Sequence, residues 1–438
     1  MTGEREAPVG LPRLLNAIPA HGAMSLAEHL SVHGEPPLAR SRRARRGAGA
    51  LIEEIEQAGL HGRGGAAFPT AVKMRGVAHA RGRPIVVVNA AEGEPASSKD
   101  HTLLTGLAHL VLDGGVLAAQ ALGADQVIVC IPESSTASLQ SVKIALAERQ
   151  HASAGLPSIE PRTVPERYVT GQESALVNHL NGGPALPTFT PPLPFERGVR
   201  RRPTLVNNAE TLAHLALIAR HGARWFRELG TTAQPGSTLI TLSGPLVYPG
   251  VYEIEHGASL SSLLHAAGGA TAPLRAGLFG GYAGAWIDAN QLPNLALRDE
   301  HLKPYGASLG AGVIALLSED ACGVAETVTV TRWLAEQSAG QCGPCVHGLD
   351  AIATSLEEVA AGTARRDAKQ RIARLASLAR RRGACGHPDG AIRFILSAIE
   401  VFAAEFADHA RHGPCDACAG ARELPLPATP RPAAALVG

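Results

Sequence analysis

The amino-acid sequence predicts an α/β layer domain, followed by a small β-rich domain and then a helical domain. In the first, short apolar runs at 85–88 and 126–131 alternate with helical segments. After Gly236, glycine and proline interrupt short β-like runs, and from Glu319 onward the pattern becomes helical. A chain of 438 residues can hold two or three such domains, each with a sizeable core.

Each domain has its own order of expected elements. In the α/β domain a short amphipathic helix leads into a glycine-rich loop, and the expected helices are 51–58, 103–122, 138–150, 174–180 and 210–221. In the β-rich domain we expect strands over 238–243, 250–254 and 277–281, with a helix over 260–267. The last domain should contain helices over 328–338, 348–361, 364–381 and 389–411.

These patterns set the expected boundaries. We expect an N-terminal extension over 1–50, an α/β domain over 51–234, a β domain over 235–318, a helical domain over 319–422 and a disordered tail over 423–438. The tail is rich in proline and alanine. The basic run at 41–46 is typical of a solvated helix face, with a docking patch for an acidic partner as the alternative.

Composition excludes several classes of protein. The net charge is +1 and aromatic residues make up 4%, which argues against nucleic-acid binding and base stacking. No apolar run approaches the roughly 18 residues that a membrane span needs, and the first residues lack a signal-peptide pattern. We therefore expect a cytoplasmic protein without membrane insertion. Seven cysteines, an odd number, indicate reduced thiols and metal chemistry more than disulfides.

The glycine-rich loop GLHGRGGAAFPTAVK, residues 59–73, is the most informative segment. Four glycines within seven residues free its backbone N–H groups to approach a phosphate or a flat ring. The polar segment 89–95 follows the strand predicted at 85–88, where open α/β sheets place their ligands. The glycine spacing does not fit the usual dinucleotide fingerprint, and alone such a loop is most often a plain turn. Together with the segments below, it indicates a flavin site.

Two later segments place polar groups at the start of a helix, where free N–H groups favour a phosphate. They are 168–174, YVTGQES, and 203–211, PTLVNNAET. Lys73 offers a cation to the same phosphate, and Asn89, Asn207 and Asn208 carry amides suited to ribityl hydroxyls or a flavin edge. The structural alternative makes 207–208 a turn and Glu210 a helix-capping acid.

The cysteines form two CxxC pairs. Cys342 and Cys345 open a predicted helix, with Cys385 forty residues later, and the second pair is Cys415 and Cys418. Four thiolates from the two pairs would suit zinc, and this alternative stays open on spacing alone. A thioredoxin-type redox pair is less favoured, because no βαβ pattern surrounds Cys342.

Five segments occur in the same order as in a known family: GLHGRGGAAFPTAVK, NAAEGEP, YVTGQESA, PTLVNNAETL and SAGQCGPC. The chain resembles the flavin-carrying, NADH-oxidising subunit of respiratory complex I and of NAD-linked hydrogenases and formate dehydrogenases. The resemblance implies an FMN-binding α/β domain, a small β-grasp (SLBB-like) domain and a helical bundle with one [4Fe–4S] cluster. It also implies an NADH dehydrogenase-like oxidoreductase, in which FMN passes single electrons from NADH to the cluster.

The resemblance assigns cofactor-binding positions residue by residue. They are Gly62, Arg63, Gly64, Gly65, Phe68, Lys73, Asn89, Glu92, Glu94, Tyr168, Gly171, Gln172, Glu173, Asn207, Asn208 and Thr211. Ala91 replaces a family Asp, and Gln172 replaces a Glu. On the NADH side only Phe68 and Glu94 match, because Gly76 and Leu193 stand near two stacking rings and Thr190 replaces a lysine. Loss of two rings at roughly 1 kcal/mol each predicts weaker NAD(H) binding.

The cluster motif also departs from the family, because Ala339 stands at its first cysteine. Cys342, Cys345 and Cys385 remain as metal ligands, enough for a [3Fe–4S] cluster or a [4Fe–4S] cluster with one other ligand. The fourth ligand is left open between His347, His387 and a returning Cys415 or Cys418. The remaining alternative is that no cluster forms and the thiols stay free.

The resemblance implies a partner that relays electrons, a ferredoxin-like or thioredoxin-like iron–sulfur protein, with a membrane redox complex as a further candidate. Two other functions fit the same residues. One is a non-catalytic assembly subunit, favoured by the departures at Gly76, Thr190, Leu193 and Ala339. The other is a flavoprotein that a reduced carrier supplies with electrons, without an NADH site.

Overall fold

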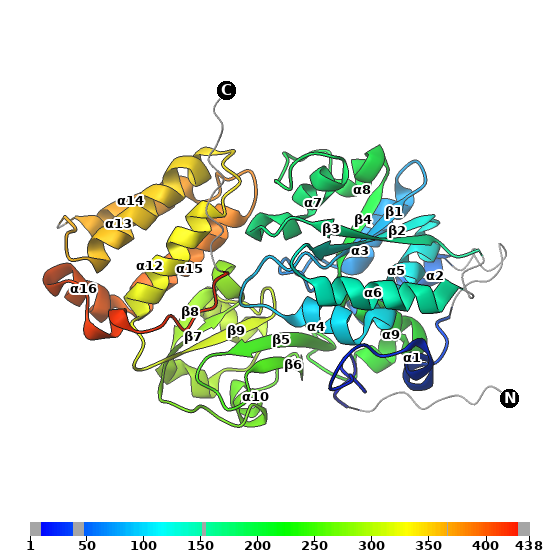
Figure 1. The fold of residues 1–438 in the computed structure, drawn as a ribbon, viewed down its shortest axis with the longest axis horizontal. Helices are drawn as coiled ribbons and strands as arrows, with labels where there is room; N and C mark the ends of the chain where they lie inside the picture. Colours follow the sequence, from blue (N-terminus) through cyan, green and yellow to red (C-terminus); the bar gives the residue numbers. More distant parts are fainter. Residues whose placement is uncertain (1–9, 38–47, 151–154, 366, 428–438) are drawn as a thin grey trace.

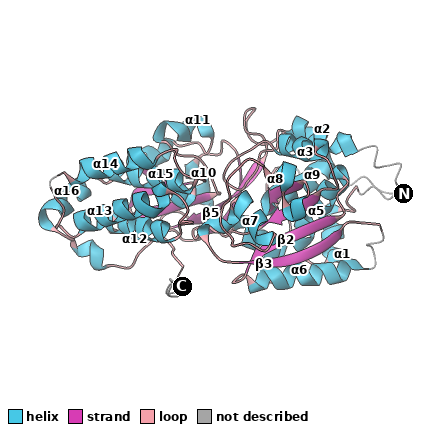
Figure 2. Cartoon of the chain, turned by 90° about the horizontal axis from the view of Figure 1, so that it is seen from above, coloured by secondary structure: helices cyan, strands magenta, loops and turns pink. Residues whose placement is uncertain are grey.

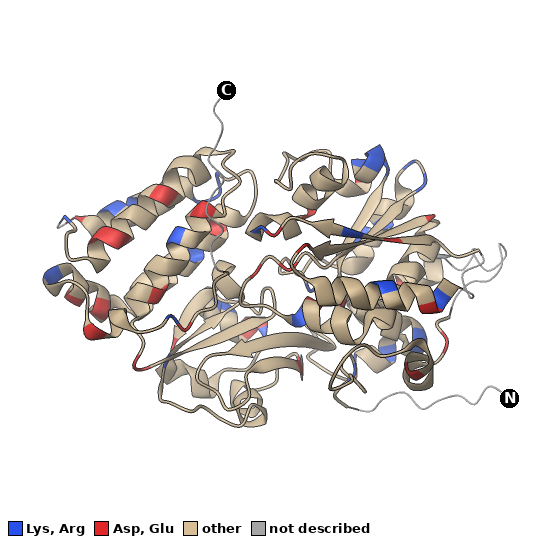
Figure 3. Cartoon of the chain, viewed as in Figure 1, with Lys and Arg blue, Asp and Glu red and all other residues tan. Residues whose placement is uncertain are grey.

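The computed structural model describes residues 10–37, 48–150, 155–365 and 367–427. Figure 1 shows three parts: an α/β part and a helical part at opposite ends, with a mixed sheet below and between them. Residues of both charges occur in all three parts (Figure 3). The basic run at 41–46 lies outside the described residues.

The α/β part contains a parallel sheet of four strands in the order β3-β2-β1-β4. The strands are β1 (Ile85–Asn89), β2 (Gln126–Pro132), β3 (Ser158–Val164) and β4 (Thr204–Asn208). Val86, Val87 and Val88 are all fully buried, as expected for a central strand covered on both faces. Figure 2 shows helices on both sides of these strands.

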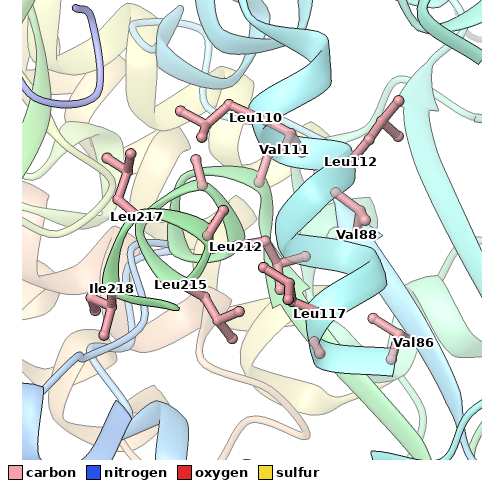
Figure 4. Close-up of a cluster of buried hydrophobic side chains, with 14 of the residues drawn as sticks. Val86, Val88, Leu110, Val111, Leu112, Leu117, Leu212, Leu215, Leu217 and Ile218 are labelled. Carbon is pink, nitrogen blue, oxygen red and sulfur yellow. The ribbon is translucent and has the colours of Figure 1, made fainter. Parts of the chain in front are cut away.

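One face of this sheet packs on α5 (Ala108–Leu122) and α9 (Ala209–Phe226). Figure 4 shows Val86 and Val88 beside the leucines of both helices, including Leu117 and Leu212. The two helices approach so closely that a Cβ atom on Gly114 would lie 1.9 Å from the carbonyl oxygen of Leu212. Glycine is therefore required where they cross.

The remaining helices of this part surround that core. They are α1 (Leu26–His33), α2 (Ala48–Ala58), α3 (Thr70–His79), α4 (Lys99–Gly106), α6 (Thr136–Arg149), α7 (Glu173–Leu180) and α8 (Pro194–Arg197). The helix expected over 103–122 is two helices, α4 and α5, bent by 97°. No single helix in the described ranges has the length and apolar composition to cross a membrane; only this bent pair meets those criteria, and only when its two helices are taken together.

The β part contains a mixed sheet of five strands in the order β6-β5-β9-β7-β8, with the helix α10 (Leu260–Ala266) and a single-turn helix, α11 (Asp299–Leu302). The strands are β5 (Ser237–Ser243), β6 (Gly250–Glu255), β7 (Leu274–Phe279), β8 (Ala285–Asp288) and β9 (Val313–Ser318). Its side chains alternate between two cores. Leu278 and Leu317 face the helical part, whereas Phe279 and Leu316 face α10.

The helical part begins with α12 (Gly323–Glu336) and a π-helical turn over Pro344–Leu349. It continues with α13 (Asp350–Ala360), α14 (Ala368–Ala379), α15 (His387–Val401) and α16 (Ala403–His412). The helix expected over 389–411 is interrupted at Phe402, whose ring is buried against Gly323.

Both ends of the described chain are more ordered than expected. Within the expected extension, α1 carries a capping box between Ser25 and Glu28. The tail was expected to be disordered from residue 423, yet Glu423 accepts a hydrogen bond from the backbone N of Ser318 at 2.9 Å, and Leu424 is buried. Residues 428–438 lie outside the described ranges.

Candidate functional site

The parallel sheet has a topological switch point between β1 and β4. From β1 the chain continues to β2 on one side, whereas β4 returns to pair with β1 on the other. At the carboxyl ends of these two strands, Asn89 lies opposite Asn208. A crevice at this position is the usual ligand site of open α/β sheets.

A cavity of about 480 Å³ opens at this switch point, within the range of small-molecule sites, about 300–1,000 Å³. All three parts of the molecule line it. The α/β part contributes the glycine-rich loop and the acidic loop, residues 90–95, which follows β1 and carries Glu92 and Glu94. The β part contributes Gly280 and Gly310, and the helical part contributes Cys385, His387 and Arg393.

Ten of the expected cofactor-binding residues line this cavity. They are Arg63, Gly64, Gly65, Asn89, Glu92, Glu94, Tyr168, Gly171, Gln172 and Asn208. The other six, Gly62, Phe68, Lys73, Glu173, Asn207 and Thr211, belong to the same segments. The sequence segments therefore converge, although up to about 150 residues separate them in the chain.

Glycines keep the floor of the cavity open. A Cβ atom on Gly171 would lie 2.5 Å from the carbonyl oxygen of Ala91, and one on Gly93 would lie 2.7 Å from that of Tyr168. Gly65 has a φ of +103°, which favours glycine. Larger residues at Gly93 and Gly171 would force the acidic loop and the turn over Tyr168–Gly171 apart.

The glycine-rich loop is held by hydrogen bonds at its base. The backbone N of Arg63 donates to the hydroxyl of Thr211 at 2.9 Å, and its guanidinium donates to the carbonyl of Ser237 at 2.9 Å. The N–H of Gly62 closes the loop onto the carbonyl of Phe68 at 2.9 Å. Arg63 and Thr211 thus position the loop, and its remaining N–H groups are available to a ligand.

Polar side chains on the sheet edge supply donors and acceptors. Asn89 donates to the carbonyl of Gly171 at 2.8 Å and accepts from the backbone N of Ala91 at 3.1 Å. Lys73 pairs with Glu173 at 3.0 Å. The side-chain nitrogen of Asn207 is buried and has no hydrogen-bond partner within the described ranges. A buried donor without a partner is costly, so it indicates a missing acceptor, as expected beside a bound polar cofactor.

The two acids of the loop after β1 have different surroundings. The carboxylate of Glu92 accepts from the backbone N atoms of Asp100 and His101, so it caps α4. Glu94 is buried and accepts from the backbone N of Tyr282 at 2.8 Å and from the hydroxyl of Tyr168 at 3.4 Å. Burial raises the pKa of Glu94 to about 7.

A buried charge cluster lies next to the carboxyl ends of β1 and β4, and sequence analysis considered only its Glu210, as a helix-capping acid. The ammonium of Lys99 lies 2.8 Å from Asp100, 3.1 Å from Glu210 and 3.3 Å from the amide oxygen of Asn208. Burial alone would raise the pKa of Glu210, but the charge of Lys99 holds it well below its usual range.

Two other residues expected to bind the cofactor, Gln172 and Tyr168, make structural contacts within the protein. The side-chain oxygen of Gln172 accepts from the backbone N atoms of Ser174 and Ala175 and caps α7. The ring of Tyr168 packs edge-on against Trp333 and His387, each at 5.4 Å. Tyr168 therefore joins the α/β part to the helical part at the cavity.

The positions expected to bind NADH, Phe68, Gly76 and Leu193, do not form a pocket lined by aromatic rings. Phe68 is 50% exposed and Leu193 is 42% exposed. A Cβ atom on Gly76 would lie 3.3 Å from the ring of Phe195, so that ring adjoins the place where the family's second aromatic residue is expected.

Negative charge on Cys342 or Cys385 would disfavour the thiolate of Cys345, so the three cysteines lie near one another. Cys345 is buried, and the backbone N of Cys345 donates to the carbonyl of Cys342 at 3.0 Å in the π-helical turn. Burial raises the pKa of the Cys345 thiol to about 12, which disfavours a reactive redox pair. Three thiols in one place suit three irons of a cluster.

The surroundings of His347, His387, Cys415 and Cys418 distinguish these candidates for a fourth cluster ligand. His347 is exposed, whereas His387 is buried with Nε2 on the carbonyl of Leu334 at 2.8 Å. The Nδ1 atom of His387 has no partner in the part of the chain described. Cys415 and Cys418 do not return to the cluster, because they lie with Cys322 and His409.

This placement corrects two expectations. Neither Cys415 nor Cys418 can complete the cluster, and the four-thiolate zinc site formed from both CxxC pairs is wrong. The sequence spacing gave no indication of Cys322, which is 93 residues before Cys415 in the chain.

Comparison with known proteins agrees with this geometry. A family model described as the Nuo51 FMN-binding domain matches residues 55–217. A second, described as the NADH-ubiquinone oxidoreductase-F iron-sulfur binding region, matches residues 325–409, which include Cys342, Cys345 and Cys385.

Relatives are similar over most of this chain. The F 2 subunit of NADH-quinone oxidoreductase from Rhizobium meliloti (strain 1021) is 29% identical over 83% of this chain and 90% of its own length. The corresponding F subunit from Streptomyces coelicolor is 30% identical, with 82% of each chain covered. The HndC subunit of the NADP-reducing hydrogenase from Solidesulfovibrio fructosivorans is 28% identical over 84% of this chain and 77% of its own.

A solved structure shares the fold. The crystal structure of an NAD+-reducing [NiFe]-hydrogenase in the H2-reduced state matches with a TM-score of 0.81 and 30% identity. The match covers 92% of this chain and 67% of the other.

Proposed function

Since this chain belongs to the family of NADH-quinone oxidoreductase F subunits, we propose that its central cavity binds FMN and that electrons leave through a cluster on Cys342, Cys345 and Cys385. The chain is an NADH-dehydrogenase-like electron-transfer protein with an FMN-binding domain and an iron–sulfur binding region. The assignment of individual residues to each cofactor is the proposal.

One observation carries the proposal. Cys385 lies on the wall of the same cavity as the glycine-rich loop and Asn89. A group bound at the end of β1 and β4 would therefore be next to a cluster ligand, without intervening protein layers. This arrangement suits direct electron transfer.

Different residues would bind different parts of FMN. Backbone N–H groups of the glycine-rich loop and the ammonium of Lys73 suit the phosphate. The amides of Asn89, Asn207 and Asn208 suit ribityl hydroxyls and the ring edge. Bound FMN would take two electrons together and release them singly, and the protein would only position it. The carboxyl group of Glu94 would fix the cavity wall toward the helical part.

For the cluster we propose three thiolate ligands, with His387 as the candidate for a fourth. The support is its position next to Cys385 at the start of α15 and its unpartnered Nδ1 among the described residues. A [3Fe–4S] cluster, with no fourth ligand, is the alternative.

The source of electrons is proposed as NADH or NADPH, bound beside Phe68 and Glu94. The exposed Phe68, and Gly76 and Leu193 where two rings are expected, favour weaker binding than in a pocket with three stacking rings. A flavoprotein that receives electrons from a reduced carrier is therefore the second candidate function.

The domain boundaries are also proposals. We propose the FMN-binding domain at 51–234, the β-grasp (SLBB-like) domain at 235–318 and the iron–sulfur domain at 319–422. A mixed five-stranded sheet with the helix α10 beside it supports the β-grasp assignment. We further propose a ferredoxin-like or thioredoxin-like iron–sulfur partner and a cytoplasmic location.

Anaerobic purification and visible spectroscopy test this function. We expect a flavin band over broad iron–sulfur absorbance, bleached by NADH. Cys345→Ser should lose the iron–sulfur absorbance and keep the flavin, whereas Cys415→Ser, outside the proposed cluster, should keep both. Bound flavin without bleaching by NADH or NADPH supports the carrier-fed flavoprotein. A protein that neither contains nor takes up FMN contradicts the proposal.

A further inference from the structure

We propose that Cys322, His409, Cys415 and Cys418 bind one zinc ion, in a site separate from the flavin cavity and from the iron–sulfur cluster. The four residues come from three places in the chain. Cys322 caps the N-terminus of α12, and His409 lies in the last turn of α16. Cys415 directly precedes the 3-10 turn Asp416–Ala419, and Cys418 lies within it. Their ligand atoms all lie within 4.8 Å of one another.

The separations between ligand atoms fit a tetrahedron around one zinc ion. With Zn–S bonds of about 2.3 Å and a Zn–N bond of about 2.0–2.1 Å, two sulfurs lie about 3.8 Å apart, and sulfur and nitrogen about 3.6 Å apart. The Sγ of Cys418 is 3.6 Å from those of Cys415 and Cys322. The Nε2 of His409 is 3.5 Å from Cys322 and 3.9 Å from Cys418.

The histidine is oriented as a metal ligand. Its Nδ1 lies 3.2 Å from the carbonyl oxygen of Ala360, so Nδ1–H donates there and the lone pair of Nε2 faces the sulfurs. The Cys322 sulfur accepts from the backbone N of Ala325 at 3.3 Å. A contact outside the ligand set thus fixes each of these two ligands.

The geometry favours a single ion over a second cluster. Thiolates of an iron–sulfur cube bind different irons and are held apart by the cube, whereas these four atoms surround one point. Three thiolates and one imidazole form a closed structural zinc set. Of the four, only His409 falls within the matched iron–sulfur region, residues 325–409, and it is the last residue of that region.

The site would fix the C-terminal strap, residues 420–427, which follows Cys418 closely. The backbone N atoms of Glu423 and Leu424 donate to Glu326 at 2.9 and 3.3 Å. The hydroxyl of Tyr282 donates to the carbonyl of Pro425. Figure 1 shows this red segment running from the helical part across the β part toward the centre of the molecule.

The strap reaches the acidic loop of the α/β part. Pro425, Leu426 and Pro427 line a cavity of about 350 Å³ together with Glu92 and Glu94. A zinc ion bound where the strap begins would therefore fix the strap residues that line this cavity beside Glu92 and Glu94. We infer a structural role for the metal, without a direct role in electron transfer.

Elemental analysis of the purified protein tests the site. We expect about one zinc per chain in addition to the cluster iron. Cys415→Ser should remove the zinc and keep the flavin and iron–sulfur absorbance, whereas Cys345→Ser should remove the iron–sulfur absorbance and keep the flavin and the zinc. Because Cys415 is exposed, its substitution should not disturb a core. Cobalt added to zinc-depleted wild-type protein should give the visible spectrum of a tetrahedral cobalt–thiolate site.

Three results would overturn the proposal. They are loss of iron from Cys415→Ser, failure of the wild-type protein to bind either zinc or cobalt, and a Cys415–Cys418 disulfide that persists in reductant. None of them bears on FMN binding. Loss of iron from Cys415→Ser would also contradict the proposed cluster ligands, whereas the other two results leave Cys342, Cys345 and Cys385 unaffected, so failure here and failure of the proposed function are distinguishable. Amide exchange at Leu424 should rise in Cys415→Ser and stay low in Cys345→Ser.

Discussion

At the scale of single residues, the carboxyl group of Glu94 gives the molecule a dependence on pH. Burial raises its pKa from 4.5 to about 7, against the backbone hydrogen bonds from Tyr282 and Ala96. The folded protein therefore holds this proton more tightly than the unfolded chain does. The associated stability is fully present below about pH 4.5 and is lost as the pH rises through about 7.

We predict that Glu94→Gln removes this loss, because an amide cannot ionise. Urea unfolding at about pH 5 and about pH 8 measures it as a difference in the free energy of unfolding. Glu300→Gln, at a side chain that is 57% exposed, is the control and should leave the wild-type pH dependence intact. An unchanged slope in Glu94→Gln would show that another group causes the dependence.

Gly171 provides a second test at this scale. An added Cβ atom would lie 2.5 Å from the carbonyl of Ala91, so Gly171→Ala must move the turn or the acidic loop. We predict a loss of FMN affinity of about tenfold or more, equivalent to roughly 1.4 kcal/mol. Fluorescence titration of flavin-depleted protein measures it. Gly250→Ala, with no atom within 4 Å of the new Cβ, should bind as the wild type does.

At the scale of elements, Glu210 joins α9 to the β part. Its carboxylate is buried and accepts from the hydroxyl of Thr238 at 3.0 Å and the backbone N of Leu239 at 2.9 Å. It also pairs with Lys99 at 3.1 Å. Removal of one partner of a buried ion pair leaves the other uncompensated.

We predict that Glu210→Ala lowers the free energy of unfolding by about 3–5 kcal/mol. The control is Glu228→Ala, because this carboxylate is 54% exposed in its pair with Arg13 and its removal should cost less than about 1 kcal/mol. Thermal and urea unfolding measure both variants. Equal losses in the two would contradict the role of Glu210 as a junction between α9 and β5.

Which elements could be predicted from sequence depended on their surroundings. The apolar strands at 85–88 and 126–131 were found because they are central and buried. β3 was missed because it is half-exposed and contains Pro161, a residue that only an edge strand tolerates. β9 was missed because a short apolar run does not by itself separate strand from helix.

The same distinction holds for the site. The glycine loop and the asparagines stand in short polar segments, so sequence alone indicated them. The set of Cys322, His409, Cys415 and Cys418 forms only through packing of α12 against α13 and α16, and no local spacing relates its first member to the others. The charge cluster of Lys99 and Glu210 was likewise hidden, because its members lie on different elements.

At the scale of the whole molecule, the C-terminal strap connects the helical part with the other two. Leu424 is 3% exposed, and its burial is worth about 1.5–3 kcal/mol. Glu423 and the strap backbone also satisfy Ser318 and the buried carboxylate of Glu326. Loss of the strap would expose the core beneath Leu424 and leave Glu326 without these donors.

We therefore predict that a chain ending at Arg422 is less stable than the full chain by about 3 kcal/mol or more, since the lost burial and the unpaired carboxylate add. A chain ending at Pro427 is the matched control, because it keeps every described strap contact. Urea unfolding of both measures the difference. Deletion to Arg422 should also raise amide exchange at Tyr282, whose N–H bonds to Glu94, because its hydroxyl loses Pro425. Equal stability of the two truncated chains would mean that the strap lies on the surface without stabilising the fold. Glu92 and Glu94 would then be held in place by the α/β and β parts alone.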